Sequence, residues 1–89
     1  MKIRIETYFS NEYDEILQKY GKVLPRFGLT RTDDGHAEIY IGTLGDIFSL
    51  HKEIEEFIDN SDNPCHYFGL MIKSYEDGTP YLEIKDNYD

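Results

Sequence analysis

The stretch TLGDIFSLHKEIEEFID, residues 43–59, combines a helix start signal with a helical repeat of apolar residues. Thr43 followed by Asp46 resembles a capping box in which aspartate replaces the usual glutamate. We therefore predict a helix that opens at Thr43 and runs to about Asp59. Its polar side carries Ser49, Glu53 and Glu56, and its apolar stripe, expected to face the core, consists of Leu44, Ile47, Leu50, Ile54, Phe57 and Ile58.

The segments on both sides of this helix alternate between apolar and polar residues, as strands do. Before it, residues 2–8 predict a strand with Ile3 and Ile5 inward, and residues 11–20 predict a short helix between the N-cap Ser10 and Gly21. Residues 26–32 and 36–43 predict a hairpin around the turn Asp33, Asp34, Gly35, with Ala37, Ile39 and Ile41 inward.

After the helix, residues 66–75 and 80–86 predict two more strands around the turn Glu76, Asp77, Gly78. Leu82 and Ile84 are expected to point inward from the last strand. In residues 66–75 the inward set is Phe68, Leu70 and Ile72. The opposite side carries Tyr67 and Met71 and is also semi-apolar, which favours a central position in the sheet.

The predicted order is β-α-β-β-α-β-β, which indicates the α+β class. Its first six elements have the order of the ferredoxin-like plait, with one hairpin strand added. We expect an antiparallel sheet with two helices on one face and a single domain over residues 1–89. The other face is expected to carry Lys2, Arg4, Glu38, Tyr40, Tyr81, Glu83 and Lys85.

Cysteine usage and hydropathy bound the compartment. The single Cys65 cannot form an internal disulfide, so a disulfide-stapled secreted scaffold is excluded. The first residues alternate charge with isoleucine and show no signal-peptide pattern. No apolar run approaches the length of a membrane span. We expect a soluble protein in the cytoplasm of a host cell.

The charges are segregated along the chain. Residues 1–31 hold six basic and four acidic side chains, a net charge of +2. Residues 32–89 hold three basic and fourteen acidic side chains, a net charge of −11, so the formal total is −9. A single-signed field of this size attracts basic partners and repels nucleic acid and anionic lipid. Direct binding to nucleic acid or membrane is therefore disfavoured.

No motif for catalysis, metal or cofactor binding stands out. The spacing of His36, His51, Cys65 and His66 matches no zinc pattern. Cys65 and His66 are neighbours on a predicted strand, so their side chains point to opposite faces and cannot work as nucleophile and base together. We expect no enzyme activity and no cofactor.

Tyrosines interleaved with acids form the candidate partner-binding surface. Tyrosine is a preferred interface residue because it offers area at low entropy cost. Carboxylates about 5–7 Å apart along a helix or strand can approximate a row of phosphates. The residues assigned to this surface are Asp46, Glu53, Glu56, Asp59, Asp62, Tyr75, Glu76, Asp77, Tyr81, Glu83, Asp86 and Tyr88.

The tail TPYLEIKDNY, residues 79–88, resembles the closing segment of small uncharacterised acidic proteins of Firmicutes and their phages. The helix start at Thr43, Leu44 and Asp46 also resembles that group, and together the likeness covers residues 38–88. It brings no assigned catalytic residues. In size, acidity and α+β make-up the chain is also similar to phage anti-CRISPR proteins, several of which imitate nucleic acid.

These observations favour a non-catalytic inhibitor that mimics nucleic acid and binds the basic groove of a defence or nucleic-acid-processing protein, such as a CRISPR effector. An immunity protein or antitoxin that caps a basic nuclease toxin is an alternative with the same physics. A third hypothesis, from another class, is a plait that binds a metabolite or metal, or a hydrolase, centred on His51 or on Cys65 and His66. The protein is expected to be a monomer or a homodimer.

Overall fold

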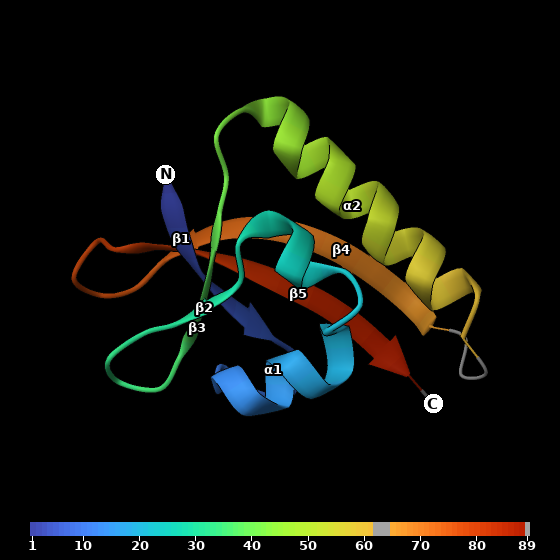
Figure 1. The fold of residues 1–89 in the computed structure, drawn as a ribbon, viewed down its shortest axis with the longest axis horizontal. Helices are drawn as coiled ribbons and strands as arrows, with labels where there is room; N and C mark the ends of the chain where they lie inside the picture. The colour runs from blue at the N-terminus through green and yellow to red at the C-terminus, as the bar shows by residue number, and fades with distance from the viewer. Residues whose placement is uncertain (62–64, 89) are drawn as a thin grey trace.

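The computed structural model of the chain describes residues 1–61 and 65–88, and for residues 65, 66, 87 and 88 it describes the backbone alone. The α+β class and the predicted order of helices and strands are confirmed, with one short 3₁₀ helix added before the second strand (Figure 1). The elements are β1 (Lys2–Thr7), α1 (Tyr13–Tyr20), η1 (Leu24–Phe27), β2 (Thr30–Arg31), β3 (Ala37–Tyr40), α2 (Leu44–Asp59), β4 (Cys65–Ser74) and β5 (Pro80–Tyr88).

The five strands form one mixed sheet in the order β2-β3-β1-β5-β4. β1 is antiparallel to β3, with Ile3 opposite Ile39, and β5 is antiparallel to β4. β1 and β5 run parallel, with Ile5 opposite Leu82, so the prediction of an entirely antiparallel sheet is wrong at this pair. The cause is the position of β5, which inserts between β1 and β4 instead of extending the sheet. β3 and β4 still run parallel on either side of α2, as the plait requires.

Both helices contribute to a single core with the strands. α1 buries Ile16 and Tyr20, and α2 buries Leu50, Ile54 and Ile58. These side chains pack with the inward residues predicted for the strands, Ile3, Ile5, Ala37, Ile39, Ile41, Leu82 and Ile84, all of which are buried. Full burial of one such side chain contributes about 1.5–3 kcal/mol. The sheet therefore has both helices on one face, and its other face is open.

β4 lies at the edge of the sheet, so its predicted central position is wrong. The predicted inward side is only partly covered: Phe68 and Leu70 pack against the core, whereas Ile72 is 52% exposed. Leu44 of the predicted α2 stripe is also exposed, at 74%. Leu44 belongs to the first turn of α2, which rises beyond the sheet at the top of Figure 1. The core of one chain therefore leaves some of the predicted inward apolar side chains uncovered.

Two local predictions near β2 differ in outcome. The turn around Gly35 is confirmed, and Gly35 has a φ of +87° that only glycine adopts readily. The strand predicted from residue 26 begins later, at Thr30, because Pro25 sits at the start of η1 and fixes a helical φ there. The predicted N-cap Ser10 also differs: α1 begins at Tyr13, and the Ser10 hydroxyl accepts a hydrogen bond from the Glu12 amide.

The capping box of α2 is confirmed. The Thr43 hydroxyl accepts a hydrogen bond from the Asp46 amide, and the Asp46 carboxylate accepts bonds from the amides of Gly42 at 2.8 Å and Thr43 at 3.0 Å. Three backbone donors around the helix start are thereby satisfied, and the carboxylate lies at the positive end of the helix dipole.

Replacing Thr43 with alanine is expected to lower the free energy of unfolding by about 1 kcal/mol, because the Asp46 amide loses its acceptor. Chemical denaturation followed by circular dichroism measures the change. Ser49→Ala, at an exposed position inside the same helix, is the matched control and is expected to change stability little. Equal losses in the two variants would show that the cap is not responsible.

Candidate functional site

The residues assigned to the acidic surface do not form one continuous patch. The C-terminal end of α2, with Glu56 and Asp59, lies at one end of the sheet (Figure 1). Glu76 and Asp77 lie in the turn between β4 and β5, at the opposite end. β4 runs ten residues between these two places, so the prediction of a single surface that joins helix and hairpin is wrong. Asp62 and the Tyr88 side chain lie outside the described part of the chain.

Three of the acids assigned to the partner-binding surface bind groups of their own fold. Asp46 caps α2 through its bonds to the amides of Gly42 and Thr43. Glu53 Oε1 lies 2.6 Å from Arg26 Nη1, which links α2 to η1. Glu83 Oε2 lies 3.1 Å from Lys73 Nζ across β5 and β4, and the Glu83 side chain is only 16% exposed. The Lys73 ammonium donates to this carboxylate, and the hydrogen bond raises the pKa of Lys73. These carboxylates already have partners, so they add little to an outward field.

The assignment of Asp86 to the partner-binding surface is wrong. The Asp86 side chain is fully buried and not on the surface, because β5 is an interior strand and residue 86 faces α1. Asp86 Oδ2 lies 2.9 Å from Lys19 Nζ, and this ammonium also lies 3.7 Å from the centre of the Phe9 ring. Burial raises the pKa of Asp86, and the bond and charge of Lys19 oppose that rise. The pair fixes α1 against the end of β5.

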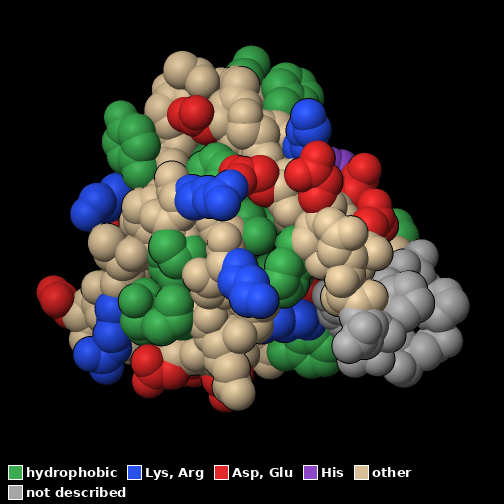
Figure 2. Space-filling view, turned by 45° about the vertical axis from the view of Figure 1, so that its right-hand side comes forward, with side chains coloured by type: hydrophobic (Ala, Val, Ile, Leu, Met, Phe, Trp, Pro, Cys, Tyr) green, Lys and Arg blue, Asp and Glu red, His purple; other side chains and the backbone are tan. Residues whose placement is uncertain are grey.

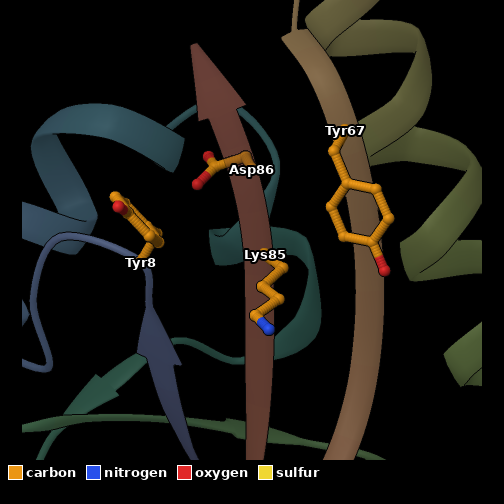
Figure 3. A pocket seen from close by; sticks show the side chains of 4 residues that line it. All are labelled: Tyr8, Tyr67, Lys85 and Asp86. Atoms are coloured by element: carbon orange, nitrogen blue, oxygen red, sulfur yellow. The ribbon is translucent and has the colours of Figure 1, made fainter.

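A pocket of about 310 Å³ lies over β5 beside this pair (Figure 3). Tyr8 and Tyr67 stand on either side of β5, and Lys85 and Asp86 complete the lining. Lys85 and Asp86 leave the strand in different directions, as neighbours on a strand do. The pocket therefore presents two exposed phenol rings and one ammonium, and it lies apart from the acids of α2.

Tyr75 and Tyr81 are tied to each other and to β1. Their rings stack with centroids 4.4 Å apart, and the Tyr75 hydroxyl donates a 2.8 Å hydrogen bond to Glu6 Oε1. Burial, followed by the Glu6 carboxylate, raises the pKa of Tyr75 to about 12. Both rings are half-buried, so they brace the hairpin and leave a limited area for contact with a partner. Asp77 has a local role too: its carboxylate accepts from the Thr79 amide, which lowers the pKa of Asp77.

Three exposed carboxylates lie close together in sequence at the end of α2. Glu56 and Asp59 were assigned from the sequence, and Glu55, which was not, joins them on the exposed side of the helix. Glu55 Oε2 lies 3.7 Å from His51 Nδ1. Figure 2 shows Asp and Glu side chains gathered beside a histidine on one face of the molecule. The last turn of α2 carries no basic residue.

A second cluster, around the β2–β3 turn, could not be found from the sequence. Arg4 Nη2 lies 3.1 Å from Asp34 Oδ2, and Arg4 Nη1 lies 3.1 Å from His36 Nδ1. His36 Nε2 lies 4.0 Å from Glu12. The Thr32 hydroxyl donates to Asp34, and this bond, ahead of the Arg4 charge, lowers the pKa of Asp34. Residues from three separate segments meet here, so the cluster joins β1 to the turn.

The residues of the third hypothesis are placed only in part. His51 is 43% exposed on α2, and its ring lies 4.8 Å from that of Phe68. No described pocket is lined by it. The side chains of Cys65 and His66 lie outside the description. Within the described residues, no three His, Cys, Asp or Glu side chains are grouped as metal ligands.

No protein-family model matches the chain. A search of curated proteins and a search of solved structures also gave no match. Among the described residues, no helix has both the length and the apolar character that a membrane crossing needs. The resemblance to acidic phage proteins therefore stays a prediction, and a function has to be inferred from the geometry of the described residues.

Removing Lys19 is expected to cost more stability than removing the charge of its partner Asp86. Lys19→Met leaves a buried carboxylate without its cation and is expected to cost about 3–5 kcal/mol at neutral pH. Asp86→Asn is expected to cost less, because Lys19 is 27% exposed and can turn to water. Denaturant unfolding of both variants measures the difference.

The loss in Lys19→Met is expected to shrink in acid. Without Lys19 the folded-state pKa of Asp86 rises further above its unfolded value, so the penalty is complete above the folded pKa, shrinks as the pH falls from there, and is gone below the unfolded pKa. A loss that stays constant as the pH falls towards the unfolded value would contradict this account of the pair.

Tyr75 is expected to ionise at a higher pH than an unperturbed tyrosine. Its folded pKa of about 12 exceeds the unfolded value, so its contribution to stability is complete below pH ~10 and is lost as the pH rises towards 12. Near-ultraviolet titration of the phenolates measures this, and the step near pH 12 that Tyr75→Phe removes is assigned to Tyr75. Glu6→Gln is expected to move that step to lower pH. A titration near pH 12 that is identical in wild type and Tyr75→Phe would contradict the expectation.

Proposed function

We propose that the protein is a non-catalytic inhibitor that binds a basic, nucleic-acid-binding surface of another protein through the C-terminal half of α2. The observation that carries the proposal is the group of Glu55, Glu56 and Asp59 at the end of that helix, where no basic residue accompanies them in the last turn. The only Lys or Arg in α2 is Lys52, one turn earlier.

The position of these acids opposes the stability of the helix. The C-terminus of a helix carries partial negative charge, so cations stabilise it and carboxylates destabilise it. Glu55 and Asp59 are four residues apart and Glu56 and Asp59 are three apart, spacings at which like charges repel. The other helix ends follow the stabilising rule: Asp14 and Glu15 lie in the first turn of α1, and Asp46 lies in the first turn of α2.

A basic partner surface would remove this local repulsion. Side chains three or four apart on a helix lie about 5–6 Å from each other, so the carboxylates form a compact group that lysines and arginines built for phosphates can reach together. The net charge of −9 adds long-range attraction for such a surface. Both a CRISPR effector and a basic nuclease toxin have a basic surface that such a group of carboxylates could bind. Binding tests with purified proteins of each class distinguish the two partners.

The test is displacement of a labelled nucleic acid from purified RNA-guided nucleases and basic nuclease toxins, followed by fluorescence anisotropy. Wild type is expected to displace the nucleic acid from a member of one class. Glu56→Lys with Asp59→Lys is expected to weaken binding by about tenfold or more, which is about 1.4 kcal/mol. Higher ionic strength is expected to weaken it further.

The matched control is Asp33→Lys with Glu76→Lys, which makes the same change in net charge at exposed positions away from α2. It is expected to bind nearly as wild type does. Equal weakening in both double variants would show that net charge alone acts, without a binding surface on α2. Failure to displace nucleic acid from any protein of the two classes would overturn the proposal.

A further inference from the structure

β4 has the composition of an interior strand but lies at the edge of the sheet. Apolar side chains occupy both of its faces, with Phe68, Leu70 and Ile72 on the helix side. On the open side are Tyr67, which is 55% exposed, and Met71, which is 49% exposed. A strand that is apolar on both faces is typical of one with neighbours on both sides.

The outer edge of β4 lacks the features that normally protect an edge strand. Natural edge strands are short, charged, bulged or interrupted by proline. β4 spans ten residues, its irregularity is confined to its beginning between Cys65 and Tyr67, and Lys73 is the only charged residue in 67–74. The opposite edge differs, because β2 has only two residues. An added strand therefore has one suitable edge on this sheet, the edge of β4.

α2 extends the apolar surface beside this edge. Leu44, Phe48 and His51 follow at spacings of four and three, so they lie on one stripe of the helix. The ring of His51 lies 4.8 Å from that of Phe68 in β4, which places the stripe on the β4 side of α2. Leu44 is 74% exposed and Phe48 is 73% exposed. Ile72, on the helix side of β4, is exposed as well, so both elements present uncovered apolar side chains.

We propose that β4 pairs antiparallel with β4 of a second copy of this chain, about a two-fold axis at Leu70. In this register Leu70 lies opposite the partner's Leu70, and Phe68 lies opposite the partner's Ile72. Gly69 lies opposite the partner's Met71, and Tyr67 opposite the partner's Lys73. Aromatic and β-branched side chains form favourable cross-strand pairs. The Tyr67 ring, whose hydroxyl lies 3.4 Å from where a Cβ of Gly69 would stand, offers the partner's Met71 an aromatic contact. Each position exposed in one copy meets a complementary position in the other.

The local charge of the edge favours a nearly neutral strand. Residues 67–74 offer no carboxylate to a basic strand and only Lys73 to an acidic one. β4 itself is a nearly neutral strand, and the two-fold axis doubles every favourable pair. The two α2 stripes then flank the axis on one face of a ten-stranded sheet, with Phe48 of each copy directed towards the other.

Salt separates this inference from the proposed function. Two chains of net charge −9 repel each other, so higher ionic strength is expected to strengthen self-association through the neutral edge. Docking of the α2 acids on a basic partner is weakened by the same change. The dimer uses β4 and the N-terminal half of α2, whereas the acidic group lies at the other end of that helix, so either can fail without the other.

Sedimentation equilibrium over a range of concentrations and salt tests the dimer. Wild type is expected to reach twice the 10.5 kDa chain mass, at lower concentration in higher salt. Phe48→Glu and Ile72→Lys, both at exposed positions, are expected to stay at the chain mass with an unchanged circular dichroism spectrum. Tyr40→Glu, 56% exposed on the other side of the sheet, is the matched control and is expected to dimerise as wild type does.

A thiol crosslink tests the register without relying on a disruptive variant. In a Cys65→Ser background, Leu70→Cys places a cysteine opposite its own copy, with Cβ atoms about 4.5–5.5 Å apart, and a short crosslinker is expected to join the two chains. Ile72→Cys places a cysteine about 14 Å from its copy, and the two chains are expected not to be joined. A wild type that stays monomeric at all concentrations overturns the inference. A dimer unaffected by Phe48→Glu and Ile72→Lys, or equal crosslinking at 70 and 72, does so as well.

Discussion

β5 pairs with β1 along one side and with β4 along the other. This position determines which side chains of the β4–β5 hairpin are buried and which are exposed. Because β5 is an interior strand, Leu82 and Ile84 enter the core and Asp86 is buried against Lys19. Because β5 takes the place beside β1, β4 is moved to the edge with apolar residues on both faces. The turn that carries Glu76 and Asp77 is thereby held at the end of the sheet away from the end of α2.

The acids of this chain fall into groups that sequence position does not distinguish. Some stabilise the fold: Asp46 caps a helix, Glu53 and Glu83 bind cations of neighbouring elements, and Asp34 holds the β2–β3 turn to Arg4. Those at the end of α2 act against the helix that carries them. An acidic total therefore says little about function until each carboxylate is assigned its neighbours, and here several carboxylates bind groups of their own fold.

The fold was largely predictable because its signals are local. The capping box at Thr43, the glycine at position 35 and the alternation around Ile3, Ile39 and Leu82 each act within a few residues. The strand order was not predictable in full, because the insertion of β5 depends on packing across the whole chain. The candidate site was predictable only at Glu56 and Asp59. Exposure of a carboxylate such as Asp86 depends on which strand becomes interior, and no pattern along the chain contains that information.

The parallel contact of β1 with β5 also has a consequence for the time course of folding. The two strands are separated by more than seventy residues, so closing this pair costs more chain entropy than forming the β4–β5 hairpin or either helix. During synthesis β1 leaves the ribosome long before β5, and until then one side of the central strand has no partner. The buried apolar row of the sheet is completed only when residues 80–86 arrive, which makes the nascent chain dependent on its last strand for cooperative folding.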